Sequence, residues 1–539
     1  MYKILFLLFL LFPTLYANKI EFDFFQDKPA SLVKDFYISR YLDQNITSKQ
    51  AASLLCQVKN LNWKLFYKFA NKIDDFSFKR VAYCKKLKPK EYYGKDADCV
   101  KIGLSIHKAT KLESSLLKNI AETIDYRYPK NAKLYKIIAD RDFKSLSADD
   151  FLTVFNQSGQ KFQKRYFNYP LSDRLLNTLS TKRGFNTTID KIVRNPNLLT
   201  LQKSILKFDS SKLNANSNFL LALNALRQNR EDIAKWYLKL SYKKAYSRYD
   251  KDKAAFWLYL ISRDKTLLRK LIKDSKEINI YTLFAYEKLS KTPKNIYTSI
   301  NPKQKEAPFD ITDPFVWLDI KSRFKNKKFK NFQSKKEAAL KLNSDDTQPH
   351  VAALIYRYKD HKHYYLFSYQ KYIKNLNPKK QAMIFAIARQ ESRFIPTAVS
   401  YSYALGLMQF MPYVAKAIAD EGNMENFEYE DMFDPKTALK FADIHLDFLQ
   451  KRFFHPLFIA YAYNAGAGYT KREILNVKHY FRDSEYEPFL SMELLPNAQA
   501  REYGKKVLTN YVIYSKLLDI KDVSLLKLLK KLRKKHLLY

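Results

Sequence analysis

The hydrophobic residues of this chain recur at helical spacing from about residue 20 to about residue 370. Short amphipathic segments follow one another over this stretch, and brief polar turns separate them. Residues 218–240 are typical, because an apolar stripe, a polar Gln228-Asn229 turn and a second apolar stripe occur in that order. This order predicts two short helices that pack as a hairpin.

The hairpin pattern recurs after 34 residues, as four pairs of apolar positions indicate: Leu226 and Leu260, Ile233 and Leu267, Tyr237 and Leu271, Leu238 and Ile272. A helix–turn–helix period of this length is that of a tetratricopeptide-like solenoid. Irregular helix-on-helix packing is the alternative that two units leave open. Both alternatives predict a curved stack of helices with a large surface.

Glycine usage supports a helical fold. The 539 residues contain nine glycines, and none lies between Phe185 and Leu405. Tight turns between strands draw on glycine because it adopts positive φ without a steric penalty. The gap therefore argues against β-sandwiches, β-barrels and Gly-rich nucleotide loops over this stretch. We expect a mainly all-α chain, with a superhelical domain of helical hairpins over residues 18–370 and chemistry concentrated after it.

The first 17 residues have the pattern of an export signal. A short basic start precedes an unbroken apolar run from Ile4 to Phe12, and Pro13, Thr14 and Ala17 follow. This run has about half of the ~20 residues that a helix needs to span a bilayer. We therefore expect residues 1–17 to be a cleaved signal peptide and the mature protein to be periplasmic.

Three cysteines, Cys56, Cys84 and Cys99, would give one disulfide and one odd thiol in an oxidising compartment. The sequence does not choose the pair, although Cys84 and Cys99 close the shortest loop. The cysteine spacings match no zinc site, and the eight histidines contain no HExxH motif. We expect neither a metal nor a cofactor.

Charge is distributed unevenly along the chain. Lys and Arg number 96 and Asp and Glu 54, which gives a net charge of +42. Nearly all of this excess lies outside residues 381–520, a block that is close to neutral. A basic surface suits an anionic partner such as a nucleic acid, a membrane surface or an acidic polymer. The export signal and the absence of a recognition motif argue against nucleic acid.

Residues 521–539 form a separate basic element. Leucines at helical spacing make an apolar stripe, and lysines and arginines crowd the rest: the leucines are Leu525, Leu528, Leu529 and Leu532. Such a helix can lie on an anionic membrane surface, peripheral to the bilayer. Docking against the protein's own domain is the interpretation that we prefer.

The candidate chemistry begins at residues 381–396, which read QAMIFAIARQESRFIP. Ile384, Ile387 and Ala388 share one helical face with Glu391, and Pro396 is expected to end the helix just beyond. A carboxylate on an apolar face is costly to ionise, so the pKa of this glutamate is expected to rise. A glutamate near a helix end is often an ordinary surface residue. The motifs around Glu391 therefore decide whether a functional role is the better interpretation.

Two glycine-bearing motifs follow this helix. Residues 404–412 read ALGLMQFMP, and residues 460–468 read AYAYNAGAG. Aromatic faces, amides and a closely approaching backbone suit a sugar chain, whose rings stack on tyrosine and whose hydroxyls need fixed hydrogen-bonding partners. For Met408 and Tyr461 we prefer the interpretation as core residues.

The motifs RQESRF, GLMQFMP and AYNAG resemble those of the soluble lytic transglycosylases, lysozyme-like enzymes that cleave peptidoglycan in the Gram-negative periplasm. A fourth motif has the form Glu493-x-x-Pro496-x-x-Gln499-x-Arg501-x-Tyr503. We therefore place a lysozyme-like catalytic domain at residues 371–520. The resemblance also implies a ring of helices ahead of it and peptidoglycan glycan strands as the substrate. Contacts with a membrane surface or with wall-synthesis proteins are left open.

The resemblance assigns roles to individual positions. Glu391 matches the single catalytic acid/base, and five residues match positions that line the glycan cleft: Ser400, Gln409, Met411, Tyr463 and Asn464. Two positions depart from the family pattern. Tyr403 stands where a glycine is common, and Gln499 stands where a glutamate is typical. The second departure turns a cleft carboxylate into a neutral amide that is still expected to contact substrate.

A single glutamate favours a lyase over a hydrolase. Glycosidases ordinarily use two carboxylates, whereas no Asp or Glu occurs from Ser392 through Ala419. Glu391 could protonate the glycosidic oxygen and then accept the proton of the muramoyl 6-hydroxyl, which attacks its own C1. The product that the resemblance implies is the 1,6-anhydro sugar. A lysozyme-type hydrolase and a weakened glycan-binding scaffold are the alternatives. The candidates for a second carboxylate are Asp443, Glu485 and Glu493.

Overall fold

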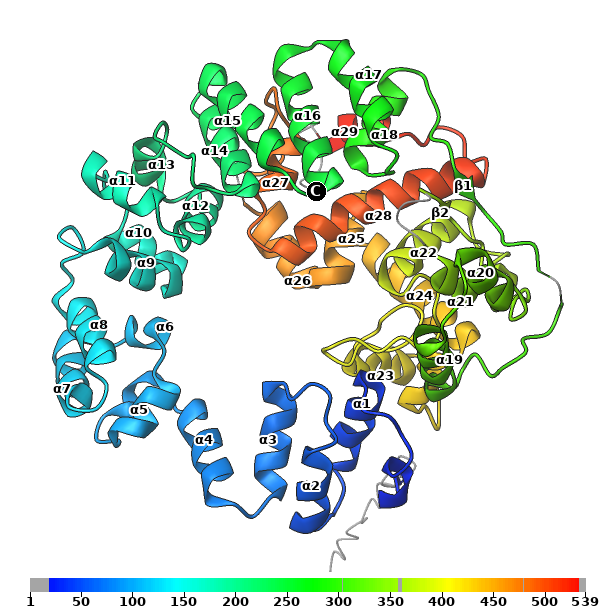
Figure 1. Cartoon of the computed structure of the whole chain (residues 1–539), viewed down its shortest axis with the longest axis horizontal. Helices are drawn as coiled ribbons and strands as arrows, with labels where there is room; N and C mark the ends of the chain where they lie inside the picture. The colour runs from blue at the N-terminus through cyan, green and yellow to red at the C-terminus, as the bar shows by residue number, and fades with distance from the viewer. Residues whose placement is uncertain (1–18, 303, 357–360, 478, 533–539) are drawn as a thin grey trace, which may run out of the picture. The chain divides into compact units, whose positions relative to one another are not determined.

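The computed structural model describes residues 19–302, 304–356, 361–477 and 479–532. The expected signal peptide at residues 1–17 and the last seven residues of the basic tail lie outside this range. The described chain is helical almost throughout (Figure 1). Within it the strands are β1 (Ile296–Tyr297) and β2 (His363–Tyr364), which pair in parallel. The expectation of a mainly all-α chain is confirmed.

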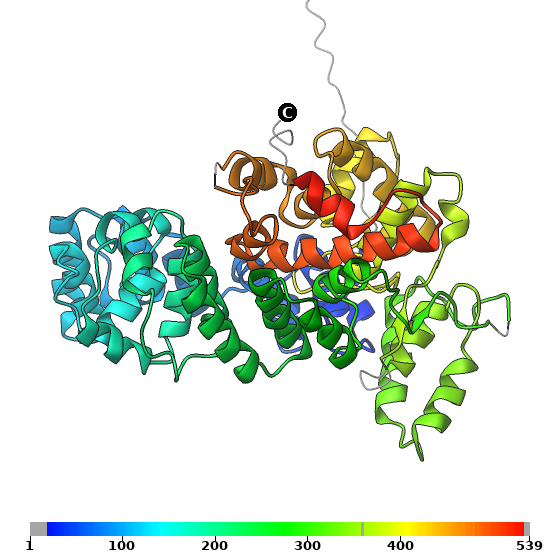
Figure 2. The ribbon, with the colours of Figure 1, turned by 90° about the horizontal axis from the view of Figure 1, so that it is seen from above.

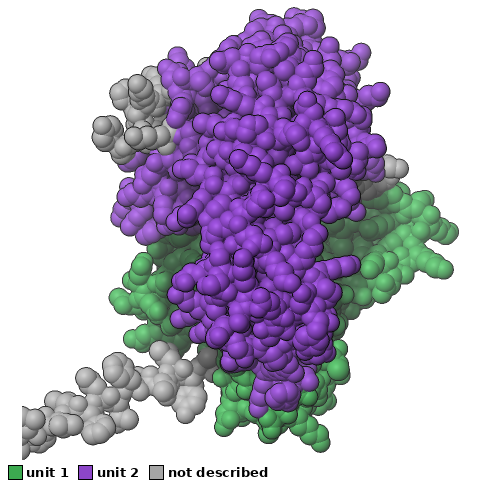
Figure 3. Space-filling model, turned by 90° about the vertical axis from the view of Figure 1, so that its left-hand side faces the viewer, with its two compact units in different colours: residues 1–75, 302–354, 391–445 green, residues 76–301, 355–390, 446–539 purple. Residues whose placement is uncertain are grey.

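Contacts within the chain define two compact units, which Figure 3 shows in different colours. Unit 1 consists of residues 1–75, 302–354 and 391–445, and unit 2 of residues 76–301, 355–390 and 446–539. Each unit is thus assembled from three segments that are far apart in the sequence. The domain boundaries expected at residues 370 and 520 follow the linear order of the chain and stay predictions.

Unit 1 joins helices from the beginning, the middle and the last third of the chain. Arg40 forms ion pairs with Glu428, at 3.2 Å, and with Glu430, and these pairs fasten the first helix to the short turn η5 (Tyr429–Phe433). The helices are α1 (Leu32–Tyr41), α2 (Ser48–Leu55), α3 (Trp63–Lys72), α19 (Pro314–Asn326), α20 (Phe332–Leu340), most of α21 (Gln348–Ile355), α23 (Pro412–Glu421) and most of α24 (Pro435–Gln450).

The larger part of unit 2 is a succession of short helices that pack against their neighbours in the chain (Figure 1). They are α4 (Phe76–Lys86), α5 (Ala97–Gly103), α6 (Ile106–Ala109), α7 (Ser114–Asp125), α8 (Pro129–Asp140), α9 (Ala148–Gln157), α10 (Gln160–Tyr166), α11 (Asp173–Ser180), α12 (Phe185–Arg194), α13 (Leu199–Ser204), α14 (Ala215–Arg227), α15 (Glu231–Lys244), α16 (Arg248–Ser262), α17 (Lys265–Asp274) and α18 (Ile280–Lys288).

The predicted hairpin and its repeat are both present. The helices α14 and α15 form the first, α16 and α17 form the second, and each pair is in contact. The turns between paired helices contain Asn229 with φ of 57° and Arg263 with φ of 58°. These two left-handed residues are 34 positions apart, so the period lies in the backbone as well as in the apolar pattern.

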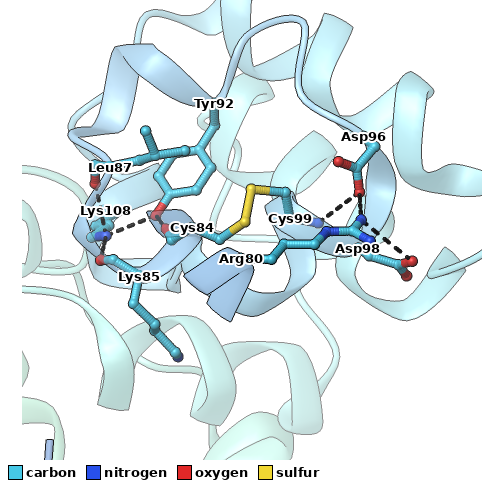
Figure 4. Close-up of a disulfide and its surroundings, with 9 residues drawn as sticks. All are labelled: Arg80, Cys84, Lys85, Leu87, Tyr92, Asp96, Asp98, Cys99 and Lys108. Atoms are coloured by element: carbon cyan, nitrogen blue, oxygen red, sulfur yellow. Dashed lines mark hydrogen bonds and ion pairs between the residues drawn. A yellow bond between two sulfur atoms is a disulfide. The ribbon is translucent and has the colours of Figure 1, made fainter. Parts of the chain in front are cut away.

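A disulfide staples α4 to α5 at the beginning of unit 2 (Figure 4). It joins Cys84 to Cys99, whose Cα atoms are 5.2 Å apart, and leaves Cys56 free and exposed. The Tyr92 hydroxyl donates to the carbonyl of Cys84 at 2.7 Å. The Lys108 ammonium donates to the Tyr92 hydroxyl at 2.8 Å, to the backbone carbonyl of Lys85 in the last turn of α4 and to that of Leu87 in the connecting loop. This network fixes the loop that the disulfide closes.

The remaining helices of unit 2 come from the last third of the chain. They are α22 (Pro378–Glu391, of which all but the last residue belongs to unit 2), α25 (Pro456–Ala465), α26 (Ala467–Tyr469), α27 (Phe489–Leu494), α28 (Ala498–Leu517) and α29 (Leu525–Leu532). Figure 2 shows α28 as one unbroken helix, which has 20 residues. It packs closely on α25 because Gly504 carries no side chain, and a Cβ there would lie 2.2 Å from Cε1 of Tyr461.

A buried charge cluster holds four helices of unit 2 together. Lys505 on α28 is 1% exposed, and its ammonium lies 2.9 Å from the Glu493 carboxylate on α27 and 3.0 Å from Glu502. Tyr281 on α18 donates to Glu493, and Tyr249 on α16 donates to Glu502 at 2.8 Å. Burial alone would raise the pKa of Glu502, but the Lys505 charge and its hydrogen bond lower that pKa to about 2. Both carboxylates of the cluster are therefore matched by hydrogen-bond donors.

The basic tail docks against unit 2, as preferred from the sequence. All four leucines of its stripe, Leu525, Leu528, Leu529 and Leu532, are buried in α29, which packs on α18 and α28. The Glu287 carboxylate accepts the backbone N–H of Leu526 at 3.0 Å. The apolar face that could have entered a membrane surface is thus covered by the protein itself. Among the described helices, none combines the length and the apolar character that crossing a bilayer requires.

The replacement Lys505→Met should lower the free energy of unfolding by about 3–5 kcal/mol, because it strands a buried carboxylate without its partner. The neighbouring Lys506 is exposed, and Lys506→Met should change stability by less than about 0.5 kcal/mol. Urea unfolding followed by circular dichroism measures both variants. Equal midpoints for the two would contradict the role given to the buried lysine.

Removing the disulfide should also destabilise unit 2. The cysteines are 15 positions apart, and closing a loop of that length stabilises a fold by about 3 kcal/mol. In urea unfolding, the double variant Cys84→Ala/Cys99→Ala should have a free energy of unfolding that is lower by about that amount. Cys56→Ala is the matched control and should unfold like the parent protein. A double variant as stable as this control would show that the cross-link is dispensable.

Candidate functional site

Glu391 is the last residue of α22 and the point at which this helix leaves the protein interior. Every residue from Gln381 to Ala388 is buried, so the helix is enclosed on all sides rather than along one face. Burial ends after Ala388, and Glu391 is half-buried. The expectation that this glutamate interrupts a single apolar stripe is therefore wrong. Its position at the emerging end of a buried helix is what distinguishes it.

The helix ends earlier than Pro396 predicts. Arg393 and Phe394 adopt φ values of 54° and 67°, which lie in the left-handed region and cannot continue a right-handed helix. Two successive residues of this kind are rare outside glycine, and nothing in their side chains announces them. The chain thus turns sharply directly after the glutamate.

Arg389 fixes the end of α22 within unit 2. Its guanidinium donates to the Tyr364 carbonyl at 2.9 Å and to the Asn510 side-chain oxygen at 2.7 Å. It also lies 3.8 Å from the centre of the Tyr365 ring. The Asn510 amide in turn donates to the Ala386 carbonyl at 3.2 Å. This anchor, which comes two residues before the glutamate, was not predicted from the sequence.

The loop that carries GLMQFMP begins directly after α22, in unit 1. The Ser392 hydroxyl donates to the Leu407 carbonyl at 2.7 Å and ties the start of the loop to its middle. Five residues between 393 and 409 have positive φ: Arg393, Phe394, Tyr403, Gly406 and Gln409. Four of them are not glycine, and such strained backbone is frequent at functional sites.

Gly406 is the glycine that this loop cannot replace. Its φ is 76°, and a Cβ built on it would lie 1.9 Å from the Met432 carbonyl oxygen. Its N–H donates to the Ala398 carbonyl at 2.8 Å. Gly406, the first glycine after a gap of more than two hundred residues, is thus required because the backbone of Met432 lies too close for a side chain.

The predicted cleft residues Ser400 and Gln409 use part of their hydrogen-bonding capacity within the loop itself. The Ser400 hydroxyl oxygen accepts the N–H of Ala404 at 2.9 Å. The Gln409 amide nitrogen donates to the carbonyls of Ala398 and Gly406, both at 2.9 Å. Both side chains are half-buried. What remains for a ligand is the hydroxyl hydrogen of the serine and the side-chain oxygen of the glutamine.

The two methionines of the loop have different surroundings. Met408 is fully buried, as expected of a core residue, whereas Met411 is half-buried at the N-terminus of α23. A thioether that is partly open to solvent offers a polarisable surface to an apolar face of a ligand. Met411 therefore keeps the exposure that a cleft residue needs.

Tyr403 lies at a left-handed position of this loop. Its φ is 64°, a value that glycine adopts easily, and its side chain is 3% exposed. The ring lies 6.3 Å from that of Phe36 on α1, and burial raises its pKa well above the usual range. Close by, the Asn62 amide donates to the Tyr401 carbonyl at 3.3 Å. Helices from the start of the chain thus support this loop within unit 1.

The other predicted residues belong to unit 2. Tyr463 is half-buried and Asn464 exposed in the last turn of α25, which ends before Gly466 with φ of 91°. Gln499 is exposed at the second position of α28. Tyr461 is fully buried, as preferred from the sequence. The predicted residues are therefore divided, with Glu391, Ser400, Gln409 and Met411 in unit 1 and the other three in unit 2.

Two of the three candidate second carboxylates are held by other residues of unit 2. Glu493 is 2% exposed and paired with Lys505, and Glu485 pairs with Arg263 at 2.7 Å. Asp443 is half-buried on α24 in unit 1. Within the described residues, no group of three or more His, Cys, Asp or Glu side chains is arranged to hold a metal ion.

Residues 368–484 match the family model described as the transglycosylase SLT domain. Over this segment the chain thus resembles the transglycosylase SLT domain. The soluble lytic murein transglycosylase of Escherichia coli strain K12 is 29% identical over 136 residues, which are 25% of this chain and 20% of that protein. Membrane-bound lytic murein transglycosylase C of Haemophilus influenzae strain PittGG is 29% identical over 145 residues, 24% of this chain and 40% of that protein. The matches thus span less than half of the length of these relatives.

Solved structures resemble the chain over most of its length. The lytic transglycosylase Slt of Pseudomonas aeruginosa, in an inactive mutant form, has a TM-score of 0.52 at 15% identity and covers 91% of this chain and 87% of its own. The 70-kDa soluble lytic transglycosylase in complex with bulgecin A has a TM-score of 0.50 at 16% identity, with 92% and 87% covered. The likeness confirms the fold expected from the sequence, an α-superhelical part followed by a lysozyme-like part.

The replacement Gly406→Ala should deform the loop after Glu391. The added methyl group meets the Met432 carbonyl and the residue must keep a positive φ, so the free energy of unfolding should fall by about 2–4 kcal/mol. Gly184→Ala is the control, because its Cβ would come no closer than 3.4 Å to Leu152. Thermal melting and limited proteolysis of residues 393–411 report the difference. A Gly406→Ala protein that melts and resists protease like the control would contradict the packing described.

Proposed function

We propose that this protein is a lytic transglycosylase that cleaves the β-1,4 bond between N-acetylmuramic acid and N-acetylglucosamine in peptidoglycan and leaves a 1,6-anhydromuramoyl end. The match to the transglycosylase SLT domain and the shared fold support this activity. The observation that carries the proposal is the position of Glu391, half-buried at the end of an enclosed helix and directly before a strained loop. Such an activity suits cell-wall turnover.

Glu391 would act first as an acid and then as a base. In its protonated form it donates a proton to the glycosidic oxygen, and the bond to C1 of the muramoyl sugar breaks. The resulting carboxylate accepts the proton of the 6-hydroxyl of the same sugar while that oxygen bonds to C1. The proton balance closes on one residue, and no water is consumed. Because the attack is intramolecular, it has the advantage of proximity.

Two rigid attachments would hold this glutamate in place. Arg389 fixes the last turn of α22 through Asn510, and Ser392 ties the following residue to Leu407. A general acid must keep its proton within hydrogen-bonding distance of the leaving oxygen, so loss of either attachment would lower the rate. We assign Arg389 and Ser392 as positioning residues.

The remaining predicted residues would bind the glycan. Ser400 and Gln409 keep one hydroxyl hydrogen and one amide oxygen for sugar hydroxyls and N-acetyl groups, and Met411 offers an apolar contact. Tyr463 and Asn464 would provide a stacking face and a polar partner, and the neutral Gln499 a hydrogen bond without charge. Glycan strands of peptidoglycan are the partner that this set of groups suits.

A hydrolase is the less favoured alternative. It requires a second carboxylate to activate water or to form a covalent intermediate, and Glu493 and Glu485 are both engaged in ion pairs. A scaffold that binds glycan without cleaving it is the other alternative, suggested by Gln499. The reaction as proposed needs no metal and no organic cofactor.

We place the protein in the periplasm, where its substrate lies. The predicted signal peptide and the disulfide suit that compartment. The excess of basic residues would hold the enzyme near an anionic wall or membrane surface through long-range attraction. Nucleic acid is not proposed as a partner. Contacts with wall-synthesis proteins remain open to experiment.

Digestion of purified peptidoglycan tests the proposal most directly. The mature protein should release fragments whose muramoyl ends are lighter by one water than hydrolytic ends, as measured by mass spectrometry. Glu391→Gln should lower the rate about 100-fold or more, because it removes the proton that the reaction needs. Glu421→Gln is the matched control, since Glu421 is exposed at the end of α23 in the same unit.

The fragments separate the alternatives. Reducing muramoyl ends would establish a hydrolase, and the absence of any fragments would favour the scaffold. Full activity in the Glu391→Gln protein would refute the assignment of the catalytic residue. Circular dichroism of both variants ensures that a loss of rate does not reflect unfolding.

A further inference from the structure

The connection between α19 and α20 in unit 1 concentrates positive charge that the proposed reaction does not use. From residue 320 to residue 336 the chain contains no Asp or Glu, and basic residues follow one another at short intervals: Lys321, Arg323, Lys325, Lys327, Lys328, Lys330, Lys335 and Lys336. We call residues 324–332 the basic turn. Its central lysines, Lys327, Lys328 and Lys330, are all exposed. In Figure 2 this part of unit 1 is drawn in light green and extends away from α23 and α24.

The charges of the basic turn are not matched within the protein. Arg323 pairs with Asp319 at 2.6 Å, one helical turn earlier in α19. The next carboxylate along the chain, that of Glu337, accepts a hydrogen bond from the Gln333 amide at 2.9 Å. The three central lysines form no ion pair with any described residue. Their charge is therefore available to a partner outside the chain.

The stability of the neighbouring helix does not explain these charges. Asn331 is the N-cap of α20, and the N-terminal end of a helix carries a partial positive charge. Lys328 and Lys330 lie directly before this cap, where the helix dipole favours carboxylates and disfavours cations. An anion that approaches from outside would compensate both the lysines and the helix end.

The basic turn has a defined conformation. The N–H of Lys327 donates to the Arg323 carbonyl at 2.9 Å and closes the end of α19. The Asn331 side-chain oxygen accepts the N–H of Ser334 at 2.9 Å, and the Ser334 hydroxyl oxygen accepts the N–H of Asn331 at 3.3 Å. Both helix ends are thus capped, and the lysines between them are presented from a fixed backbone. A surface that binds them has little backbone entropy to remove.

Phenylalanine rings lie among the lysines of the basic turn. The ring centres of Phe324 and Phe329 are 5.6 Å apart, and the Lys327 ammonium is 5.4 Å from the centre of the Phe329 ring. Both rings are half-buried, so each keeps an apolar surface beside the cations. Basic residues next to partly exposed aromatic rings suit the boundary between lipid headgroups and acyl chains.

We propose that the basic turn binds the surface of a phospholipid bilayer that carries anionic lipids. The lysines are attracted by the negative surface potential, and Phe329 contacts the acyl chains at its boundary. Lysine is a flexible point charge that suits many headgroups, whereas paired recognition of carboxylates on a protein draws on the planar guanidinium of arginine. The one arginine of this region, Arg323, is already paired. The contact is separate from α29, and it does not depend on the proposed cleavage of glycan.

Co-sedimentation of the full mature protein with vesicles tests the inference. The probes are vesicles of phosphatidylethanolamine with one quarter phosphatidylglycerol, and vesicles of phosphatidylcholine alone. The parent protein should bind the first kind and stay in the supernatant with the second. The triple variant Lys327→Gln/Lys328→Gln/Lys330→Gln should bind the anionic vesicles about 100-fold more weakly, since each charge near such a surface contributes a factor of about five.

The matched control removes three charges from α17. Lys265, Lys270 and Lys273 are exposed on this helix, and Asp264 and Asp274 lie at its two ends. The triple variant Lys265→Gln/Lys270→Gln/Lys273→Gln lowers the net charge by the same amount as the first variant. Its affinity for the anionic vesicles should stay within about twofold of that of the parent, because overall charge alone is screened by salt.

A second variant tests the apolar part of the contact. Phe329→Ser keeps every charge of the basic turn and should weaken vesicle binding about tenfold, because the surface that a half-buried ring presents to the acyl chains is lost. Circular dichroism verifies that each variant is folded. The three central lysines are exposed, so their variant should fold like the parent protein, and it decides the question if Phe329→Ser does not fold.

Three results would overturn the inference. The first is a parent protein that does not bind the anionic vesicles. The second is a folded lysine variant that binds them like the control, which would place the membrane contact elsewhere, for example at α29. The third is a folded Phe329→Ser protein with full affinity, which would show that the turn recognises negative charge alone and that an acidic protein or polymer suits it as well as lipid.

Discussion

The buried ammonium of Lys505 is the interaction on which much of unit 2 depends. It draws together α27 and α28 through Glu493 and Glu502, and tyrosines of α16 and α18 complete the cluster. A charge in the interior is tolerated only when every partner is in place, so the cluster admits one arrangement of these helices. The element that carries Gln499 is thereby fixed to helices that lie more than two hundred residues earlier in the chain.

The helical fold could be predicted because its signals are local. Apolar spacing, polar turns and the lack of glycine all act within one or two turns of helix, and the 34-residue hairpins appear where that pattern placed them. The end of α22 could not be predicted in the same way. Arg393 and Phe394 adopt left-handed conformations because the path of the following loop requires a sharp turn there. Tertiary constraints of this kind produce no periodic pattern in a sequence.

The candidate site shows the same division. The interpretation of Met408 and Tyr461 as core residues, made from the residue types alone, is confirmed by their burial. Motif resemblance brought Glu391 forward as the candidate catalytic residue. It could not show that the amide nitrogen of Gln409 donates to two carbonyls of its own loop, or that Arg389 anchors the end of the helix that carries Glu391 through Asn510. Both facts depend on partners brought in by tertiary folding. The assignment of roles to these residues stays a prediction until the variants are assayed.

The order of the three cysteines has a consequence for how the protein matures. A chain that is made and exported from its N-terminus presents Cys56 and Cys84 before Cys99 has emerged. The first two thiols to meet an oxidant are therefore not the pair that the folded protein contains. Correct pairing requires either that oxidation waits for α5 to fold against α4 or that a premature bond is exchanged. In an oxidising compartment the exposed Cys56 remains afterwards as a nucleophile for such an exchange.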